Sequence, residues 1–407
     1  MQKAEKLYYL LFDMHPNTIK EVIKSDLCLG CGLCHVINED TDITEKDGNL
    51  KSSFKNTASK EDHIKVCPGA GYDIEEMGKS IHQAPHFIYE LGYYSSLQLV
   101  HSTDDEILKR ASSGGAMTAI ALYMLESGKA DGIICTKYTY PNGKPRQTTY
   151  VARTKAELLE AQGSKYCPTS TLSILTELKE GERYVLIGTP CQIAGWRKYA
   201  KYYSITFEIV LTIANFCGGY RDYREMDYFV KEVAGFNTVT HFQHRGDGVP
   251  GQMRIVNEEG KEWSYPYPEY AKLSPIQKNN RCVYCIDATG ELADFSCGDA
   301  WLDRVKTTNQ VWSTIIARNE KAEAILAQIK TGGYIEVGEI SQDEVILSQK
   351  LNITSKKYRQ YKRMKVSSWM LRTIPNWHHK VYDVSGNYFS EIKILVSKFL
   401  DKHIRKK

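Results

Sequence analysis

The chain has 407 residues, 42% of them hydrophobic, and a formal net charge of +4, an ordinary composition for a globular protein of two or three domains. A charge this small does not predict a nucleic-acid partner. We find no apolar stretch of about 18 residues and no signal peptide, so we expect a cytoplasmic protein. The 11 cysteines of such a chain favour metal or redox chemistry over disulfides.

The N-terminal part is predicted to join a helix to a cysteine-rich segment. Apolar residues recur at helical spacing within residues 1–25. Residues 26–71 contain four cysteines but few apolar side chains, so we expect a bound cluster to organise this segment.

From residue 97 onward, strand patterns alternate with helical patterns. Strands are predicted over 131–138, 183–188 and 207–215, and helices over 112–127, 155–162, 169–179 and 190–199. This alternation is typical of an α/β domain with a mostly parallel sheet.

After residue 218 the pattern becomes mixed. A helix is predicted over 222–235, three short strands over 239–244, 252–257 and 261–265, a strand over 311–318 and a helix over 319–330. The last 60 or so residues are predicted to be helical.

The first group of cysteines is Cys28, Cys31, Cys34 and Cys67. The first three have C-x2-C-x2-C spacing, which suits three corners of a [4Fe–4S] cluster, and the Cys-Pro at Cys67 suits the fourth. The alternative is a zinc knuckle, although zinc sites usually combine two separate C-x-x-C pairs.

A second group is less clear from spacing. Cys191 and Cys217 each follow a predicted strand, so both are expected at the same edge of a parallel sheet. The pair Cys282 and Cys285 could fold over them as part of one metal site, with Cys297 as a fifth candidate. A single buried cysteine is also a common small hydrophobe, as we expect of Cys135, and Cys167 is left open.

Three turns at element ends are candidates for binding the phosphates of a flavin. Glycines and serines before a helix let an anion approach the free N–H groups at its N-terminus. The candidate residues are Ser112, Ser113, Gly114 and Gly115 in the first turn, Gly163, Ser164, Lys165 and Tyr166 in the second, and Thr189 in the third. A flavin is also the cofactor that converts single electrons into hydride. A G-x-G-x-x-G motif after a first strand, the mark of a nicotinamide site, is missing.

These motifs together resemble the coenzyme F420 hydrogenase/dehydrogenase beta subunit family. That family includes the beta subunits of F420-reducing hydrogenase and F420-dependent formate dehydrogenase, 7-hydroxymethyl chlorophyll a reductase and bacterial relatives found among polysaccharide genes. The resemblance spans roughly residues 25–320 and rests on Ser112–Gly115, Gly163–Tyr166, Gly188–Gln192, Arg245–Gly251, Cys282–Cys285, Glu291–Asp294 and Gly298–Trp301.

The resemblance implies three cofactors. FAD would lie near Ser112–Gly115 and Gly163–Tyr166. One [4Fe–4S] cluster would bind Cys191, Cys217, Cys282 and Cys285, and a ferredoxin-type cluster would bind Cys28, Cys31, Cys34 and Cys67. Whether Cys167 or Cys297 replaces one of these ligands is open.

Two further features carry functional hypotheses. His244 and Arg245 are the candidate catalytic residues, since a histidine beside an arginine could donate a proton while a flavin delivers hydride, although His244 could equally be a strand residue facing the core or solvent. Residues 356–372 contain seven basic and no acidic side chains, and 391–407 form a basic amphipathic pattern. Such a tail binds the inner face of an anionic membrane, its own domain or a partner.

We therefore expect an α/β (overall α+β) protein in four parts. These are an N-terminal helix with a ferredoxin-like iron–sulfur module (1–85), an α/β FAD domain (86–216), a mixed C-terminal iron–sulfur domain (217–345) and a basic helical tail (346–407).

Three hypotheses for function follow. In the first, a reductase takes electrons from reduced ferredoxin, through two [4Fe–4S] clusters and FAD, to a small organic substrate such as a sugar or nucleotide sugar in polysaccharide biosynthesis. In the second, the chain is the electron-transfer beta subunit of a hydrogenase or dehydrogenase complex that reduces coenzyme F420. In the third, zinc fills the cysteine sites of an interaction protein. The substrate, the direction of electron flow and the oligomeric state are not predicted.

Overall fold

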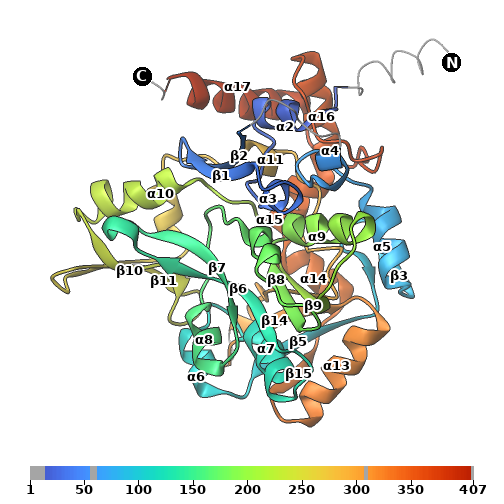
Figure 1. Ribbon diagram of the computed structural model, residues 1–407, viewed down its shortest axis with the longest axis vertical. Coiled ribbons are helices and arrows are strands. Elements are labelled where there is room, and N and C mark those ends of the chain that lie inside the picture. Colours follow the sequence, from blue (N-terminus) through green and yellow to red (C-terminus); the bar gives the residue numbers. More distant parts are fainter. Residues whose placement is uncertain (1–13, 56–61, 307–309, 405–407) are drawn as a thin grey trace.

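A computed structural model describes residues 14–55, 62–306 and 310–404 (Figure 1). Its central element is an eight-stranded sheet with the strand order β15-β5-β14-β13-β9-β8-β6-β7. The strands are β5 (Ser96–Ser102), β6 (Gly132–Thr139), β7 (Arg146–Ala152), β8 (Arg183–Gly188), β9 (Glu208–Asn215), β13 (Phe295–Asp299), β14 (Ser313–Ala317) and β15 (Ile335–Glu339).

The centre of this sheet is parallel and its edges are antiparallel. β13, β9, β8 and β6 pair in parallel, as the alternation of strands and helices predicts. β7 pairs antiparallel at one edge, and β14, β5 and β15 do so at the other. The sheet crosses the predicted boundary at residue 216, because β13, β14 and β15 come from the C-terminal half of the chain. The protein therefore has a mixed α/β fold around one large sheet.

Helices cover both faces of the sheet. They are α6 (Asp105–Arg110), α7 (Ala116–Glu126), α8 (Lys155–Glu160), α9 (Pro190–Tyr202), α13 (Glu320–Thr331) and α14 (Gln342–Ser348). Successive strand residues point to opposite faces. On β6, Ile133 joins the hydrophobic cluster of α7 and α13, whereas Ile134 joins the cluster that contains Ile193 of α9. Burial on both faces explains why the central strands are continuous apolar runs.

The predicted helix over 1–25 is confirmed only in part where it can be tested. Among the described residues it is limited to α2 (Ile19–Lys24), residues 14–18 are not helical, and residues 1–13 lie outside the described part. The remaining elements before the sheet are α3 (Leu33–Ile37), β1 (Thr41–Lys46), β2 (Asn49–Phe54), α4 (Asp62–Val66), α5 (Ile74–His82), β3 (His86–Ile88) and β4 (Gly92–Tyr94).

The cysteine-rich segment packs on the large sheet. Leu27, Leu33 and Val66 are buried in the same hydrophobic cluster as Ile193 and Trp196 of α9. As the sequence predicts, the segment does not build a core alone; it shares the main core, a contact that the sequence did not predict.

The C-terminal half adds a small antiparallel sheet and several helices. These elements are α10 (Tyr223–Tyr228) with a π-helical turn (Phe229–Val233), β10 (Val239–Gly246), β11 (Gln252–Asn257), β12 (Glu262–Pro266), a 3₁₀ turn (Glu269–Lys272), α11 (Asn280–Val283), α12 (Asp303–Lys306), α15 (Lys350–Ile353) with a π-helical turn (Thr354–Tyr358), α16 (Gln360–Trp369) and α17 (Tyr388–Ile404).

Two helix predictions are corrected. Residues 169–179 form only a 3₁₀ turn at Thr171–Thr176, and residues 371–387 in the predicted helical tail form an irregular connection between α16 and α17.

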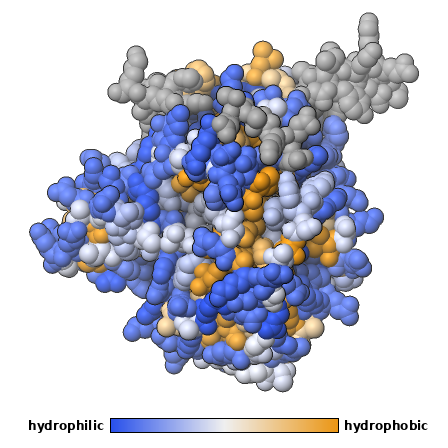
Figure 2. Space-filling model, in the orientation of Figure 1, coloured by the Kyte–Doolittle hydropathy of each residue, from blue (hydrophilic) through white to orange (hydrophobic). Residues whose placement is uncertain are grey.

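The basic run at 356–372 is partly internal. Lys356, Lys357 and Arg363 are buried, with Lys357 Nζ 2.6 Å from a carboxylate oxygen of Glu291 and Arg363 Nε 2.7 Å from Glu391. Several apolar side chains at this end of the molecule are exposed, and apolar surface is visible there in Figure 2. None of the helices in the described part is both long and apolar enough to cross a membrane.

Candidate functional site

Four of the predicted cluster ligands meet at the carboxyl ends of the central strands. Cys191 lies in the first turn of α9, just after β8, and Cys217 follows β9. Cys282 and Cys285 lie in and just after α11. Burial and the nearby thiols of Cys217, Cys282 and Cys285 raise the pKa of Cys191 to about 12. A metal cation placed among these sulfurs would favour their thiolate forms, so the group has the chemistry of a metal site.

Hydrogen-bond donors surround these sulfurs. The Gly219 N–H lies 3.3 Å from Cys217 Sγ, and Lys356 Nζ lies 3.4 Å from Cys285 Sγ. Gly219 has φ of +101°, and a Cβ there would come within 3.0 Å of the Cβ of Cys282. Four thiolates with N–H donors fit a [4Fe–4S] cluster. We call this group the inner thiol cluster.

The second group of ligands comes together in the N-terminal segment. The pKa of Cys31 is raised by burial and by the thiols of Cys67, Cys34 and Cys28. Gly32, with φ of +103°, starts α3 and brings Cys34 back toward Cys31. Cys67 follows α4, and Lys198 Nζ donates to its backbone carbonyl at 2.9 Å. This donor set also fits a [4Fe–4S] cluster, and we call it the outer thiol cluster.

A cavity of about 560 Å³ adjoins the inner thiol cluster, within the size range of cofactor pockets. Its wall includes all four cysteines of that cluster together with Ser112, Ser113, Gly115, Gly163, Ser164, Lys165, Tyr166, Thr189 and Arg245. The three turns that the sequence proposes for a flavin therefore line one cavity.

Two residues of the predicted flavin turns have other roles. A Cβ at Gly114 would come within 2.4 Å of the Val100 carbonyl and 2.5 Å of the Ser313 amide, so this glycine allows the turn to lie against the sheet. Lys165 Nζ donates to the backbone carbonyls of Ala161, Gln162 and Gly163 at 2.8–3.1 Å. Burial lowers the pKa of Lys165 to about 8.

Arg245 is held rigidly at the cavity wall. Its guanidinium forms an ion pair with Asp299 at 2.7 Å and donates to the Ser112 and Pro250 carbonyls. The guanidinium carbon lies 4.6 Å from the centre of the Tyr267 ring and 5.1 Å from that of Trp301. These contacts join the first flavin turn to the C-terminal half of the site.

His244, on the neighbouring position of β10, does not line the described cavity. It is fully buried, and its Nδ1 lies 2.7 Å from the Tyr138 hydroxyl. Burial, followed by the charges of Lys165 and Arg221, lowers its pKa to about 3. The imidazole is neutral at pH 7, so it has no imidazolium proton to donate.

Sequence reasoning missed Lys356 as a site residue. In the sequence it is one of seven basic residues spread over a segment of 17 positions, and its partner Cys285 is 71 residues away. No local sequence pattern distinguishes Lys356 from the neighbouring basic residues. Only the fold brings it next to Cys285.

Comparison with known proteins identifies the family. Models of the coenzyme F420 hydrogenase/dehydrogenase beta subunit match residues 98–176 with their N-terminal part and residues 181–343 with their C-terminal part, more than half of the chain. The coenzyme F420 hydrogenase subunit beta of Methanococcus voltae is 31% identical over 283 residues, which cover 65% of this chain and 92% of that protein.

More distant relatives extend the comparison. The coenzyme F420-dependent sulfite reductase of Methanocaldococcus jannaschii is 26% identical over 79% of this chain and 49% of that protein. The 7-hydroxymethyl chlorophyll a reductase of Oryza sativa is 24% identical over 75% of this chain and 61% of that protein.

The fold has a solved counterpart. A chain of the F420-reducing [NiFe] hydrogenase complex from Methanosarcina barkeri superposes with a TM-score of 0.56 and 23% identity, covering 72% of this chain and 99% of that one. These relatives are oxidoreductases or subunits of oxidoreductases. The chain belongs to the coenzyme F420 hydrogenase/dehydrogenase beta subunit family.

Proposed function

We propose that this chain is an electron-transfer flavoprotein subunit that links two [4Fe–4S] clusters to the two-electron carrier F420 or a related acceptor. The observation that carries the proposal is the opening of the inner thiol cluster onto the same 560 Å³ cavity that the predicted flavin turns line. Cofactors that exchange electrons must lie close together, and this cavity meets that condition. The comparisons favour this second hypothesis from the sequence over a ferredoxin-driven reductase of sugars, because the relatives include several F420-linked enzymes.

The bound cofactors would supply single-electron transfer at the clusters and hydride transfer at the flavin. The residues of the chain bind and orient them. Cys191, Cys217, Cys282 and Cys285 hold the inner cluster, and Lys356 places a positive charge beside it. The Ser112 and Ser164 hydroxyls, 3.0 Å apart, join the first two flavin turns. The ion pair of Arg245 and Asp299 ties the first of these turns to the C-terminal half of the site.

The experiment is anaerobic purification followed by reduction and reoxidation. Dithionite-reduced protein should be reoxidised by F420, with a matching gain in reduced F420, and the flavin and cluster absorption should return together. Protein with both cofactors that is not reoxidised by F420 would refute the acceptor, and protein without flavin would refute the flavoprotein assignment itself.

A free-standing reductase is a second candidate, and the outer thiol cluster favours it. Cys28, Cys31, Cys34 and Cys67 all precede residue 98, where the match to the family models begins. A chain with its own outer cluster has an entry point for a soluble donor such as ferredoxin. Affinity purification that returns this chain alone, in a form that reduced ferredoxin reduces, would support this candidate over a subunit of a larger complex.

A further inference from the structure

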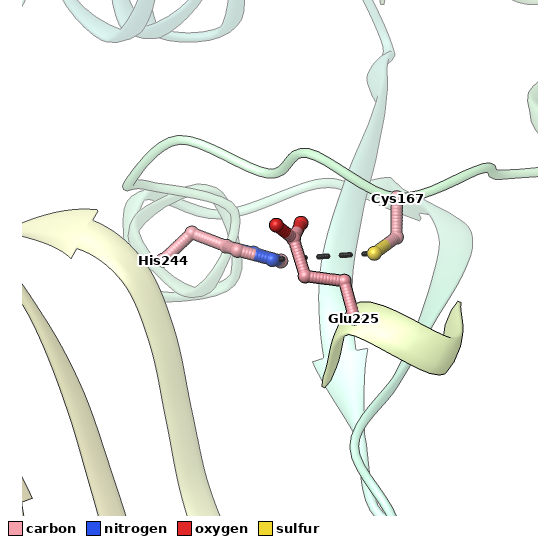
Figure 3. A group of neighbouring side chains, drawn as sticks. All are labelled: Cys167, Glu225 and His244. Carbon is pink, nitrogen blue, oxygen red and sulfur yellow. Dashed lines mark hydrogen bonds between the residues drawn. The ribbon is translucent and has the colours of Figure 1, made fainter. Parts of the chain in front are cut away.

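Three buried side chains apart from the two thiol clusters face one another. Cys167 lies on the connection after α8, Glu225 in α10 and His244 in β10, and Figure 3 shows their functional groups pointing toward a common centre. One sulfur, one carboxylate oxygen and one ring nitrogen all lie within 4.8 Å of one another. The exposed fractions are 6% for Cys167, 1% for Glu225 and 0% for His244.

The spacing of these atoms is close to that of a metal site. A tetrahedral zinc ion with bonds of about 2.3 Å to sulfur and about 2.0–2.2 Å to nitrogen and oxygen holds its ligand atoms roughly 3.3–3.8 Å apart. Cys167 Sγ and His244 Nε2 are 4.0 Å apart, at the outer limit of a hydrogen bond to sulfur. A movement of a few tenths of an ångström would bring both onto one ion.

The imidazole is already oriented for a ligand at Nε2. The Tyr138 hydroxyl lies 3.3 Å from the Ser164 carbonyl, to which it can donate, and 2.7 Å from His244 Nδ1. With that donation made, the Nδ1–H donates to the tyrosine oxygen, and the Nε2 lone pair points toward Cys167. Metal-bound histidines are commonly fixed in this way by a partner at the other ring nitrogen.

The carboxylate also has capacity for a ligand. Glu225 Oε1 makes no hydrogen bond of good geometry, and the Arg221 guanidinium lies 3.0 Å from it as an ion pair. Arg221 therefore balances the charge of the carboxylate, one oxygen of which lies within 4.8 Å of both the sulfur and the ring nitrogen.

We propose that Cys167, Glu225 and His244 form a site for one zinc ion, separate from the eight predicted cluster ligands. A thiolate, an imidazole and a carboxylate are the three ligand types that zinc takes in proteins. Binding releases the Cys167 thiol proton to solvent. The ion would tie α10 and β10 to the segment that follows the second flavin turn, where Cys167 lines the large cavity.

The test uses the full chain with its clusters loaded, purified anaerobically without a metal-affinity column. The protein is incubated with zinc chloride and desalted, and zinc, iron and sulfide are counted. We expect about one tightly held zinc per chain, with one sulfur at about 2.3 Å and lighter atoms at about 2.0 Å in zinc-edge X-ray absorption. Failure to retain zinc, or a zinc environment of four sulfurs, which marks zinc in the cluster sites, would overturn the proposal.

Variants separate this site from the clusters. Cys167→Ser and His244→Gln should each lower zinc retention at least tenfold without lowering the iron and sulfide content. Cys135→Ser, which removes a buried thiol in β6 elsewhere, should keep zinc at the wild-type level. Equal zinc retention by all three variants would overturn the proposal. If a variant does not fold, the zinc-edge X-ray absorption spectrum of the wild-type protein decides the question alone.

Discussion

The ammonium group of Lys356 donates a hydrogen bond to the sulfur of Cys285 over 3.4 Å. Lys356 is 4% exposed, and its second hydrogen bond, at 2.7 Å, goes to the carbonyl of Asp287. Its pKa is raised because the thiols of Cys285, Cys217 and Cys282 outweigh the effect of burial, which acts in the opposite direction and is the largest single influence. A buried positive charge therefore lies against the inner thiol cluster.

This contact predicts the reduction potential of the inner cluster. A cationic donor stabilises the more negative, reduced form, so Lys356→Met should lower the potential by at least about 59 mV, a tenfold change in the one-electron equilibrium. Redox titration followed by electron paramagnetic resonance measures it. The exposed Lys350→Met is the matched control on the preceding turn and should leave the potential unchanged. Equal potentials in Lys356→Met and wild type would show that the lysine does not tune the cluster.

The two thiol clusters should lose iron independently. Cys282→Ser should remove about four irons from the inner cluster and Cys31→Ser about four from the outer one, because each substitution deletes one thiolate of a [4Fe–4S] site. Iron and sulfide analysis checks this, with Cys297→Ser as a buried-cysteine control. If Cys297→Ser loses iron and Cys282→Ser does not, the ligand assignment is wrong.

His82 should make the stability of the fold depend on pH. Its Nε2 lies 2.9 Å from the Glu291 carbonyl, and burial, then the charge of Arg318, lowers its pKa to about 3. Below the ordinary pKa of about 6.5, the unfolded chain takes up a proton that the folded chain refuses, so the free energy of unfolding falls as the pH falls. At pH 5.5 the loss is about 1.4 kcal/mol.

The His82→Gln variant tests this effect. Unfolding followed by circular dichroism at pH 7.5 and pH 5.5 should show a smaller decrease in stability for His82→Gln than for wild type, by about 1.4 kcal/mol. His86→Gln, an exposed position on β3, should show the wild-type decrease. An unchanged decrease in His82→Gln would mean that other groups cause the acid sensitivity.

Arg245 should contribute strongly to stability and to flavin retention. Arg245→Met leaves Asp299 without its partner in a largely buried site, and breaking such a pair costs about 3–5 kcal/mol. Arg304→Met breaks an exposed ion pair with Glu344 and should cost less than about 1 kcal/mol. Thermal unfolding and flavin content of both variants check the contrast, which fails if Arg245→Met unfolds no earlier than Arg304→Met.

Strong local patterns predict the central part of the fold well. β8 spans the predicted residues 183–188, and β6 and β9 lie within one residue of their predicted bounds, because strands buried on both faces are continuous apolar runs. Residues 169–179 also carry apolar side chains, yet they form a 3₁₀ turn. The segment packs against α3 and α9, and this tertiary packing outweighs the helical pattern.

Contacts between segments that are distant in the sequence could not be predicted from local patterns. The spacing of Cys28, Cys31 and Cys34 predicts a cluster locally, whereas Cys191 and Cys285 come together only because β8 and β9 are neighbours and α11 folds back over their ends. The completion of the sheet by β13, β14 and β15, and the contact of Lys356 with Cys285, leave no local mark in the sequence.

Cofactor content of the anaerobically purified protein tests the central claim most directly. Iron, acid-labile sulfide and flavin should be present at about eight, eight and one per chain, with cluster absorption that bleaches on addition of dithionite. Zinc in place of iron in the eight cluster cysteines, or full iron content without any flavin, would contradict the account of an iron–sulfur flavoprotein.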